Sequence, residues 1–268
     1  MRSILYLPCP ILHNEFMFIA VFKTLLIFAR TLYYLCISFK KNCNLLELKQ
    51  QWALSVLNEL GVAVRVIDHH CQKRNLVFVG NHIGFLDIIV LIAIEPRIVF
   101  LSKAEVAKWP IIGAGAKRIG VIFVNRESSH SRAASKEAIF ARLNANDESV
   151  YIAGFPSGTT CLHEELPWKK GLFEIAQTTN TDVQSFKLKY SPLRPCAYID
   201  DDTLFGSLMG LFKTENKKVI LEWGNSFQVS NLTEQIEATR QWTQTALNFN
   251  DDKAPVPAGS FVRPSSSF

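Results

Sequence analysis

Short apolar segments alternate with helix-patterned segments from about Leu45 onward in this 268-residue chain. Runs rich in Val, Ile and Phe predict buried strands, and the stretches between them have apolar residues at helical spacing. Parallel strands need long crossover connections, which are usually helices. We therefore predict an α/β domain with a largely parallel central sheet and helices on both faces. The expected strands cover 62–67, 75–80, 97–102, 120–125, 150–155, 183–190 and 218–223, and the expected helices cover 45–60, 84–94, 104–117, 130–145, a segment from Gly171, and 231–247.

An almost continuous apolar stretch, residues 16–39, precedes this domain. A helix of that length would be about 36 Å long, which is enough to cross a bilayer. Lys23 and Arg30 interrupt the stretch, and because they are seven residues apart they fall on one helical face. A cation near the bilayer centre costs at least ~2.5 kcal/mol. An interfacial or re-entrant membrane anchor therefore fits better than a clean span, and a buried core helix is the alternative.

The chain divides into three parts on this basis. Residues 1–44 are the expected membrane-associated helical segment, residues 45–249 the predicted α/β domain, and residues 250–268 a tail. The tail is rich in proline and serine, so we expect it to be disordered. A net charge of +5 suits an anionic membrane surface, a phosphate-bearing substrate or a nucleic acid. Nucleic acid is the least favoured partner, because basic residues are not interleaved with aromatic ones and no zinc-finger spacing occurs.

The cysteines indicate neither disulfides nor a metal site. All six cysteines are scattered along the chain without a CxxC pair. This pattern favours free cysteines that pack as small buried side chains, in a protein of a reducing compartment. Asp68-His69-His70-Cys71 spells the DHHC string of protein palmitoyltransferases. Those enzymes carry the string inside a cysteine-rich zinc domain, whereas the next cysteine here is Cys161. We interpret the string as a coincidence and predict no metal site.

The segment from Asn81 to Asp87 carries the clearest chemistry. It directly follows the predicted buried strand 75–80, and ligands of parallel α/β sheets bind at the carboxyl ends of strands. His82 can act there as a base near neutral pH, and Asp87 can orient the imidazole. Five helical residues span about 140° on the wheel, so His82 must lie in the turn before the helix that contains Asp87. A histidine and an aspartate at this spacing are, taken alone, more often structural.

Further segments follow this one in a recognisable order: 100–106 with 109–113, 120–126 ending in Arg126, 155–160 reading Phe-Pro-Ser-Gly-Thr-Thr, and 169–173 beginning Lys-Lys-Gly. Together they resemble the glycerolipid, or lysophospholipid, acyltransferase family, whose members are lysophosphatidic acid acyltransferase-like enzymes. That family carries an NHxxxxD signature, a second signature ending in arginine, and a third that usually reads FPEGT. The resemblance covers roughly residues 50–225.

The resemblance implies transfer of a fatty acyl group from acyl-CoA or acyl carrier protein to the free hydroxyl of a lysolipid. The commonest acceptor in the family is 1-acylglycerol 3-phosphate, which gives phosphatidic acid, and it is the acceptor that we expect; lysophosphatidylethanolamine and a lyso-ornithine lipid are the alternatives. His82 would be the base and Asp87 its orienting carboxylate, with no covalent acyl-enzyme and no cofactor. The expected partners are membrane lipids, the lysolipid and the thioester donor, and we expect the active face toward the cytoplasm, where soluble donors are found. The implied substrate-binding residues are Arg126, Ser157, Gly158, Thr159, Thr160 and Lys103.

Three of these binding residues also have an ordinary structural interpretation. Arg126 could hold an anionic headgroup or could be a surface arginine at a strand end. Lys103 could add positive potential or could be a solvated lysine. Gly158 could admit a ligand close to the backbone or could belong to a plain turn.

The later signatures depart from the family pattern. Ser157 stands where Glu is usual, Thr160 where many members have Arg, and Ser185 where a proline is typical. With its threonine pair, the third signature resembles that of relatives which act on other headgroups, including ethanolamine- and ornithine-type lysolipids. Acyl transfer is therefore better supported than any particular acceptor.

Two other function classes remain open at this point. A serine hydrolase could use Ser157, although the nucleophile motif is G-x-S-x-G and this serine comes one place late, after a proline. A membrane-binding relative that has lost catalysis could have lost the usual Glu. The intact pair of His82 and Asp87 argues against the second reading.

Overall fold

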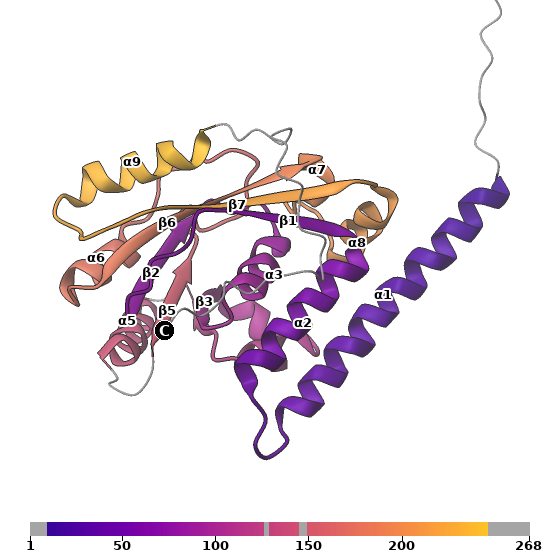
Figure 1. The fold of residues 1–268 in the computed structure, drawn as a ribbon, viewed down its shortest axis with the longest axis horizontal. Helices are drawn as coiled ribbons and strands as arrows, with labels where there is room; N and C mark the ends of the chain where they lie inside the picture. The colour runs from indigo at the N-terminus through magenta and orange to yellow at the C-terminus, as the bar shows by residue number, and fades with distance from the viewer. Residues whose placement is uncertain (1–9, 126–128, 145–148, 246–268) are drawn as a thin grey trace, which may run out of the picture.

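The computed structural model describes residues 10–125, 129–144 and 149–245. Seven strands form one sheet in the order β1-β7-β6-β2-β5-β3-β4 (Figure 1). All neighbouring pairs are parallel except β6 and β7, which are antiparallel. The predicted α/β class with a largely parallel sheet is therefore confirmed. The strands are β1 (Val62–Ile67), β2 (Asn75–Gly80), β3 (Ile98–Lys103), β4 (Ile122–Val124), β5 (Val150–Gly154), β6 (Asp182–Ser191) and β7 (Lys217–Phe227).

Helices connect the strands and cover the sheet, and several begin or end where the sequence predicts. Asn44 caps the second helix by accepting a hydrogen bond from the Glu47 N–H, and Gly61 ends it with a φ of 63°. The helices are α1 (Pro10–Ser38), α2 (Leu45–Leu60), α3 (Phe85–Ile94), the 3₁₀ helix η1 (Ala104–Lys108), α4 (Ile112–Arg118), α5 (Ser129–Asn144), α6 (Gly171–Thr178), α7 (Leu193–Cys196), α8 (Leu204–Lys213) and α9 (Leu232–Gln244).

One expectation about the helices is wrong, and two helices were not predicted. The single helix expected over 104–117 is two, η1 and α4, because Pro110 disfavours helical backbone before it and Ile111 adopts a φ of 62°. The sequence patterns also did not predict α7 and α8. These two helices return the chain to the edge where β6 ends, which pairs Ser191 with Lys218 and makes β7 antiparallel to β6.

The strands bury alternate side chains in two hydrophobic clusters, one on each face of the sheet. Leu76 and Phe78 of β2 belong to the cluster under α2 and α3, whereas Val77 and Val79 belong to the cluster with α5, α6 and α9. Successive side chains of a strand point to opposite faces, so a sheet that is covered on both sides needs continuous apolar strands. This explains why Leu76–Val79 is wholly apolar and wholly buried.

Helix α1 packs along α2 and turns its charged residues toward it. Lys23 and Arg30 each lie 3.8 Å from the Glu59 carboxylate of α2, so the prediction that both lie on one helical face is confirmed. The outward side of α1 carries exposed large apolar side chains, among them Phe18, Phe22 and Leu25. Residues Met17–Ser38 are long and apolar enough to cross a membrane, and 17% of this segment's most apolar window is buried within the protein.

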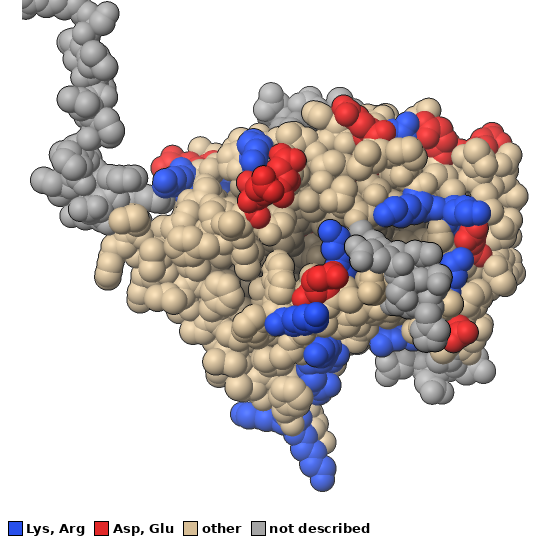
Figure 2. All heavy atoms as spheres, turned by 180° about the vertical axis from the view of Figure 1, so that it is seen from behind, with Lys and Arg blue, Asp and Glu red and all other residues tan. Residues whose placement is uncertain are grey.

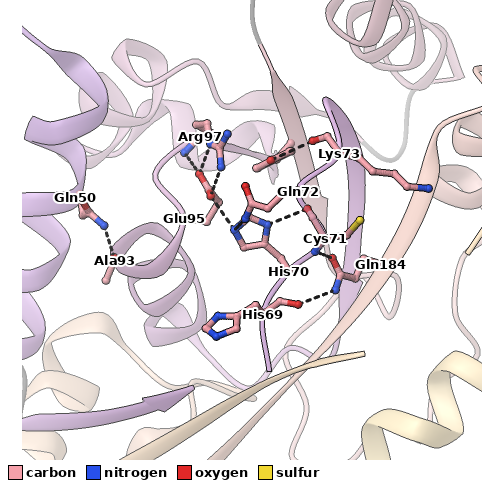
Figure 3. Close-up of polar contacts among 11 residues, drawn as sticks. Gln50, His69, His70, Cys71, Gln72, Lys73, Ala93, Glu95, Arg97 and Gln184 are labelled. Carbon is pink, nitrogen blue, oxygen red and sulfur yellow. Dashed lines mark hydrogen bonds and ion pairs between the residues drawn. The ribbon is translucent and has the colours of Figure 1, made fainter. Parts of the chain in front are cut away.

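A buried charged cluster lies at the amino ends of β2 and β3, away from the carboxyl end of β2. His70 Nε2 lies 3.0 Å from Glu95 Oε2, and Arg97 holds the same carboxylate through two side-chain N–H groups (Figure 3). Burial alone would raise the pKa of Glu95, but the hydrogen bonds from Arg97 and His70 outweigh it and lower that pKa to about 2. The DHHC string is thus part of a structural cluster, in which the Cys71 N–H donates to Gln184.

Candidate active site

His82 lies in the short turn between β2 and α3, at the carboxyl end of a central strand. Asn81, directly before it, ties this turn to the neighbouring strand β6. Its side-chain amide donates to the Leu188 carbonyl and accepts from the Leu188 N–H, both at 2.8 Å. The asparagine of the signature therefore fixes the place where the chain leaves the sheet, which sets the position of the histidine.

His82 and Asp87 form a hydrogen-bonded pair. His82 Nδ1 lies 2.7 Å from Asp87 Oδ2, and the same oxygen accepts from the backbone N–H groups of Ile83 and Gly84. Asp87 is fully buried, whereas the His82 side chain is 18% exposed. Because Nδ1 donates to the carboxylate, Nε2 is left with the lone pair that a general base requires. The expected geometry, with His82 in the turn and Asp87 in the first turn of the helix, is what the structure has.

Phe155 holds the imidazole from one side. The two rings stack with centroids 3.8 Å apart and planes 8° from parallel. Phe155 follows β5, which pairs with β2, so neighbouring strands deliver the two rings to the same edge of the sheet. The stacked ring and the Asp87 hydrogen bond together restrict rotation of the His82 side chain.

Glu164 fixes the backbone of His82 and was not predicted from the sequence. Its carboxylate accepts from the His82 N–H at 2.9 Å and from the Trp168 indole N–H at 2.7 Å. Its own carbonyl accepts from the side chains of Arg240 and Gln244 on α9. Glu164 is buried, although a Glu-Glu pair in a polar segment ordinarily indicates a solvated surface. Through its carboxylate and its backbone carbonyl, Glu164 connects the turn that holds His82 to α9.

Cys161 lies beside the pair but is not suited to nucleophilic catalysis. Its N–H donates to the His82 carbonyl at 2.8 Å, and its thiol donates to Glu164 at 3.5 Å. Burial and the nearby Glu164 carboxylate raise the pKa of Cys161 to about 12. The thiol therefore stays protonated at neutral pH, whereas a cysteine nucleophile acts as the thiolate.

The third signature forms a turn that packs beside His82. The Ser157 hydroxyl donates to the Thr159 carbonyl at 3.0 Å, and Ser157 is buried. The Gly158 N–H donates to the Phe155 carbonyl, and the φ of 79° at Gly158 is one that glycine adopts freely. Thr159 is exposed and Thr160 half-buried. With its hydroxyl committed to the turn, Ser157 stabilises this loop rather than standing ready as a hydrolase nucleophile.

Lys103 is the predicted cationic binding residue whose position the structure describes. Lys103 is the last residue of β3 and is exposed at the carboxyl end of that strand. β5 lies between β3 and β2, so Lys103 is on the same edge of the sheet as His82 but two strands away. Arg126 lies outside the described residues.

Known proteins share both this sequence pattern and this fold. Residues 61–199, slightly more than half of the chain, match the family described as Acyltransferase. This chain belongs to the acyltransferase family. The predicted family is thereby confirmed, and the matched segment of this acyltransferase contains His82, Asp87, Phe155 and Glu164.

The individual relatives are enzymes with two different names. A lyso-ornithine lipid O-acyltransferase of Pseudomonas aeruginosa is 31% identical over 181 residues, which cover 66% of this acyltransferase and 68% of that protein. A 1-acyl-sn-glycerol-3-phosphate acyltransferase of Neisseria meningitidis is 28% identical over 50% of this chain and 52% of its own length. The crystal structure of PlsC, the acyltransferase for 1-acyl-sn-glycerophosphate from Thermotoga maritima, matches with a TM-score of 0.60. That match covers 84% of this chain and 95% of the other at 15% identity, so it shows a shared fold.

Proposed function

We propose that this acyltransferase moves a fatty acyl group from a thioester, on coenzyme A or acyl carrier protein, to the free hydroxyl of a lysolipid. The observation that carries the proposal is the pair of His82 and Asp87, with Nδ1 held at 2.7 Å and Nε2 left to act as a base. His82 takes the proton of the acceptor hydroxyl while the hydroxyl oxygen attacks the thioester carbonyl. When the tetrahedral intermediate collapses, the C–S bond breaks and the imidazolium returns the proton to the departing thiolate. The buried Asp87 carboxylate stabilises the imidazolium between these two steps.

Two acceptors fit this chemistry. The first is 1-acylglycerol 3-phosphate, the substrate named for the Neisseria relative, with Arg126 as the proposed phosphate ligand. The second is a lyso-ornithine lipid, the substrate named for the Pseudomonas relative. Two observations favour the second candidate: Thr160 stands where many family members have arginine, and Ser157 is used within a turn. A pocket with fewer cations holds a phosphomonoester less firmly and tolerates a zwitterionic headgroup better.

A competition assay separates these acceptors. We expect the wild type to acylate both lyso-ornithine lipid and 1-acylglycerol 3-phosphate when they are supplied in equal amounts. Thr160→Arg should shift the ratio of products toward phosphatidic acid by about 10–100-fold, because a charge-assisted hydrogen bond contributes about 1.5–3 kcal/mol. His163→Arg adds the same charge at a nearby exposed position outside the predicted binding residues and is the matched control. A wild type that accepts one lysolipid alone would refute the mixed specificity.

The same proposal places the protein on a membrane with its active site on the cytoplasmic side. The support is the exposed apolar face of α1, whose cations are paired with Glu59 on the inward side. Figure 2 shows a broad uncharged surface that narrows to a tip with basic side chains, and Figure 1 has the turn between α1 and α2 at the same lower end of the molecule. Lys40 and Lys41 belong to this turn. Cations beside an apolar surface suit the anionic headgroups of a bilayer.

Replacing Phe18, Phe22 and Leu25 with serine tests this anchoring. Each large apolar side chain that moves from water into the bilayer contributes about 1.5–3 kcal/mol to membrane binding. Loss of all three should therefore lower the partition coefficient into vesicles at least ~1000-fold. Because these side chains are exposed, the thermal unfolding of the protein should change little. Co-sedimentation with vesicles measures the first quantity, and a variant that still sediments like the wild type would place the anchor elsewhere.

The orientation of the active site has its own test. Sealed inside-out vesicles should use added acyl-CoA, and right-side-out vesicles should not.

A further inference from the structure

We propose that Tyr190 is a positioning residue that orients Asp87 and thereby sets the basicity of His82; this inference rests on the proposed function. Tyr190 lies near the end of β6, and its hydroxyl donates to Asp87 Oδ1 at 2.7 Å. Asp87 Oδ2 is already occupied by His82 Nδ1 and by two backbone N–H groups. Tyr190 therefore serves the oxygen that faces away from the histidine.

The fold places this hydroxyl with little freedom. Phe186, Leu188 and Tyr190 alternate along β6, so all three point to the face of the sheet that α3 covers. The Tyr190 ring is 4% exposed, and the Asp87 carboxylate on α3 lies directly in reach of its hydroxyl. The ring of Tyr190 is fixed in this register, so only the O–H bond can still rotate. In one of its two in-plane orientations, the hydroxyl hydrogen points at the carboxylate.

Charge arguments make Tyr190 a permanent donor. Burial and the adjacent Asp87 raise the pKa of Tyr190 well above its ordinary value, so the hydroxyl keeps its proton throughout the working pH range. The Glu164 carboxylate, which accepts from the His82 N–H, is another titratable group of this region. The thiols of Cys161 and Cys196 also interact electrostatically with Asp87. Burial raises the pKa of these thiols to about 12 and about 11, so they remain neutral as well.

The consequence for His82 has a definite sign. A hydrogen bond to Oδ1 draws negative charge away from Oδ2, which weakens the attraction between the carboxylate and a protonated imidazole. Without the Tyr190 hydroxyl, more charge stays on Oδ2 and the imidazolium form of His82 is favoured. The free base form, which catalysis requires, then appears only at higher pH. Loss of the hydroxyl also lets the carboxylate rotate, so the imidazole is less well oriented.

Tyr190→Phe tests this role because it removes the hydroxyl and keeps the ring. We expect kcat to fall about tenfold while KM for the lysolipid stays within about twofold, and we expect the acid limb of the pH–rate profile to move up by roughly half a pH unit. The matched control is Tyr151→Phe. It removes a buried hydroxyl that donates to the Lys73 carbonyl at the other edge of the sheet, and it should leave the acid limb in place.

A second variant has the opposite expected sign. Site-specific 3-fluorotyrosine at position 190 keeps the hydroxyl and makes it a stronger donor, so the acid limb should move to lower pH. This variant adds one fluorine atom and remains informative if Tyr190→Phe does not fold. An acid limb that stays in place in either folded variant would show that Tyr190 merely packs, and would overturn the proposal.

Titration of the His82 ring by NMR separates this inference from the proposed function. The midpoint should shift upward in Tyr190→Phe whether or not the protein turns over the lysolipids that are supplied. A shifted midpoint in a protein that transfers no acyl group would refute the proposed function and support the role of Tyr190. An unshifted midpoint in an active acyltransferase would refute the role of Tyr190 and leave the proposed function standing.

Discussion

Replacing His82 with alanine should lower kcat for acyl transfer by about 10²–10⁴-fold, the usual contribution of a general base. The imidazole is the group with a free lone pair at the carboxyl end of β2, and Asp87 behind it is fully buried and holds its other nitrogen. Without the imidazole, the attacking hydroxyl must lose its proton to water. Binding of the lysolipid should change much less, so the loss should be in kcat rather than in KM.

The assay for this prediction needs a histidine control from the same region. His163→Ala removes an exposed imidazole from the segment that packs against the catalytic turn, and it should keep most of the activity. Acyl transfer is followed with labelled acyl-CoA and acyl carrier protein, each with a panel of lysolipids. Turnover that persists in His82→Ala would refute the mechanism. Labelling of Ser157 by a fluorophosphonate probe would point instead to a serine hydrolase.

Glu164→Ala should be strongly destabilising. It removes the acceptor for the part-buried His82 N–H and for the buried Trp168 indole N–H. An unsatisfied buried donor costs about 1–3 kcal/mol and a part-buried one costs less, so the free energy of unfolding should fall by about 2–5 kcal/mol. In a domain of this size that corresponds to a decrease in Tm of roughly 5–15 °C.

Turnover should fall along with stability, because the backbone of His82 loses its fixed position. Glu165→Ala is the matched control, since Glu165 is the adjacent and exposed carboxylate. Thermal unfolding in detergent and kcat measured well below both melting temperatures distinguish lost folding from lost positioning. If Glu164→Ala and Glu165→Ala had the same Tm and the same kcat, the assignment of Glu164 would be wrong.

The hydrogen-bonded pair was predictable because it is local. His82 and Asp87 are five residues apart, and the boundary between a buried strand and an apolar helix determines how they face each other. Glu164 and Tyr190 were not predictable in the same way. They contact this pair across 82 and 103 residues of chain, and their positions depend on a loop path and on the register of β6. A sequence pattern contains neither quantity.

The same distinction applies to the fold. Strands such as β2 and β5 were predicted because two-sided burial requires continuous apolar residues. Helix α8 was missed because Gly206 and Gly210 lower helix propensity, and its formation depends on burial of Leu208 and Leu211. The reversed direction of β7 follows from where α7 and α8 return the chain, which is a property of tertiary packing.

The position of β1 in the sheet has a consequence for the order of folding during synthesis. β1 is an edge strand, and it bonds to β7, whose residues 217–227 come at least 150 positions later. The ribosome therefore releases the apolar N-terminal helices and β1 long before the partner of β1 exists. Pairings between distant segments form slowly, and an open strand edge is prone to wrong association. Early capture of α1 by a bilayer would keep the nascent chain apart from other copies until β7 arrives to complete the sheet.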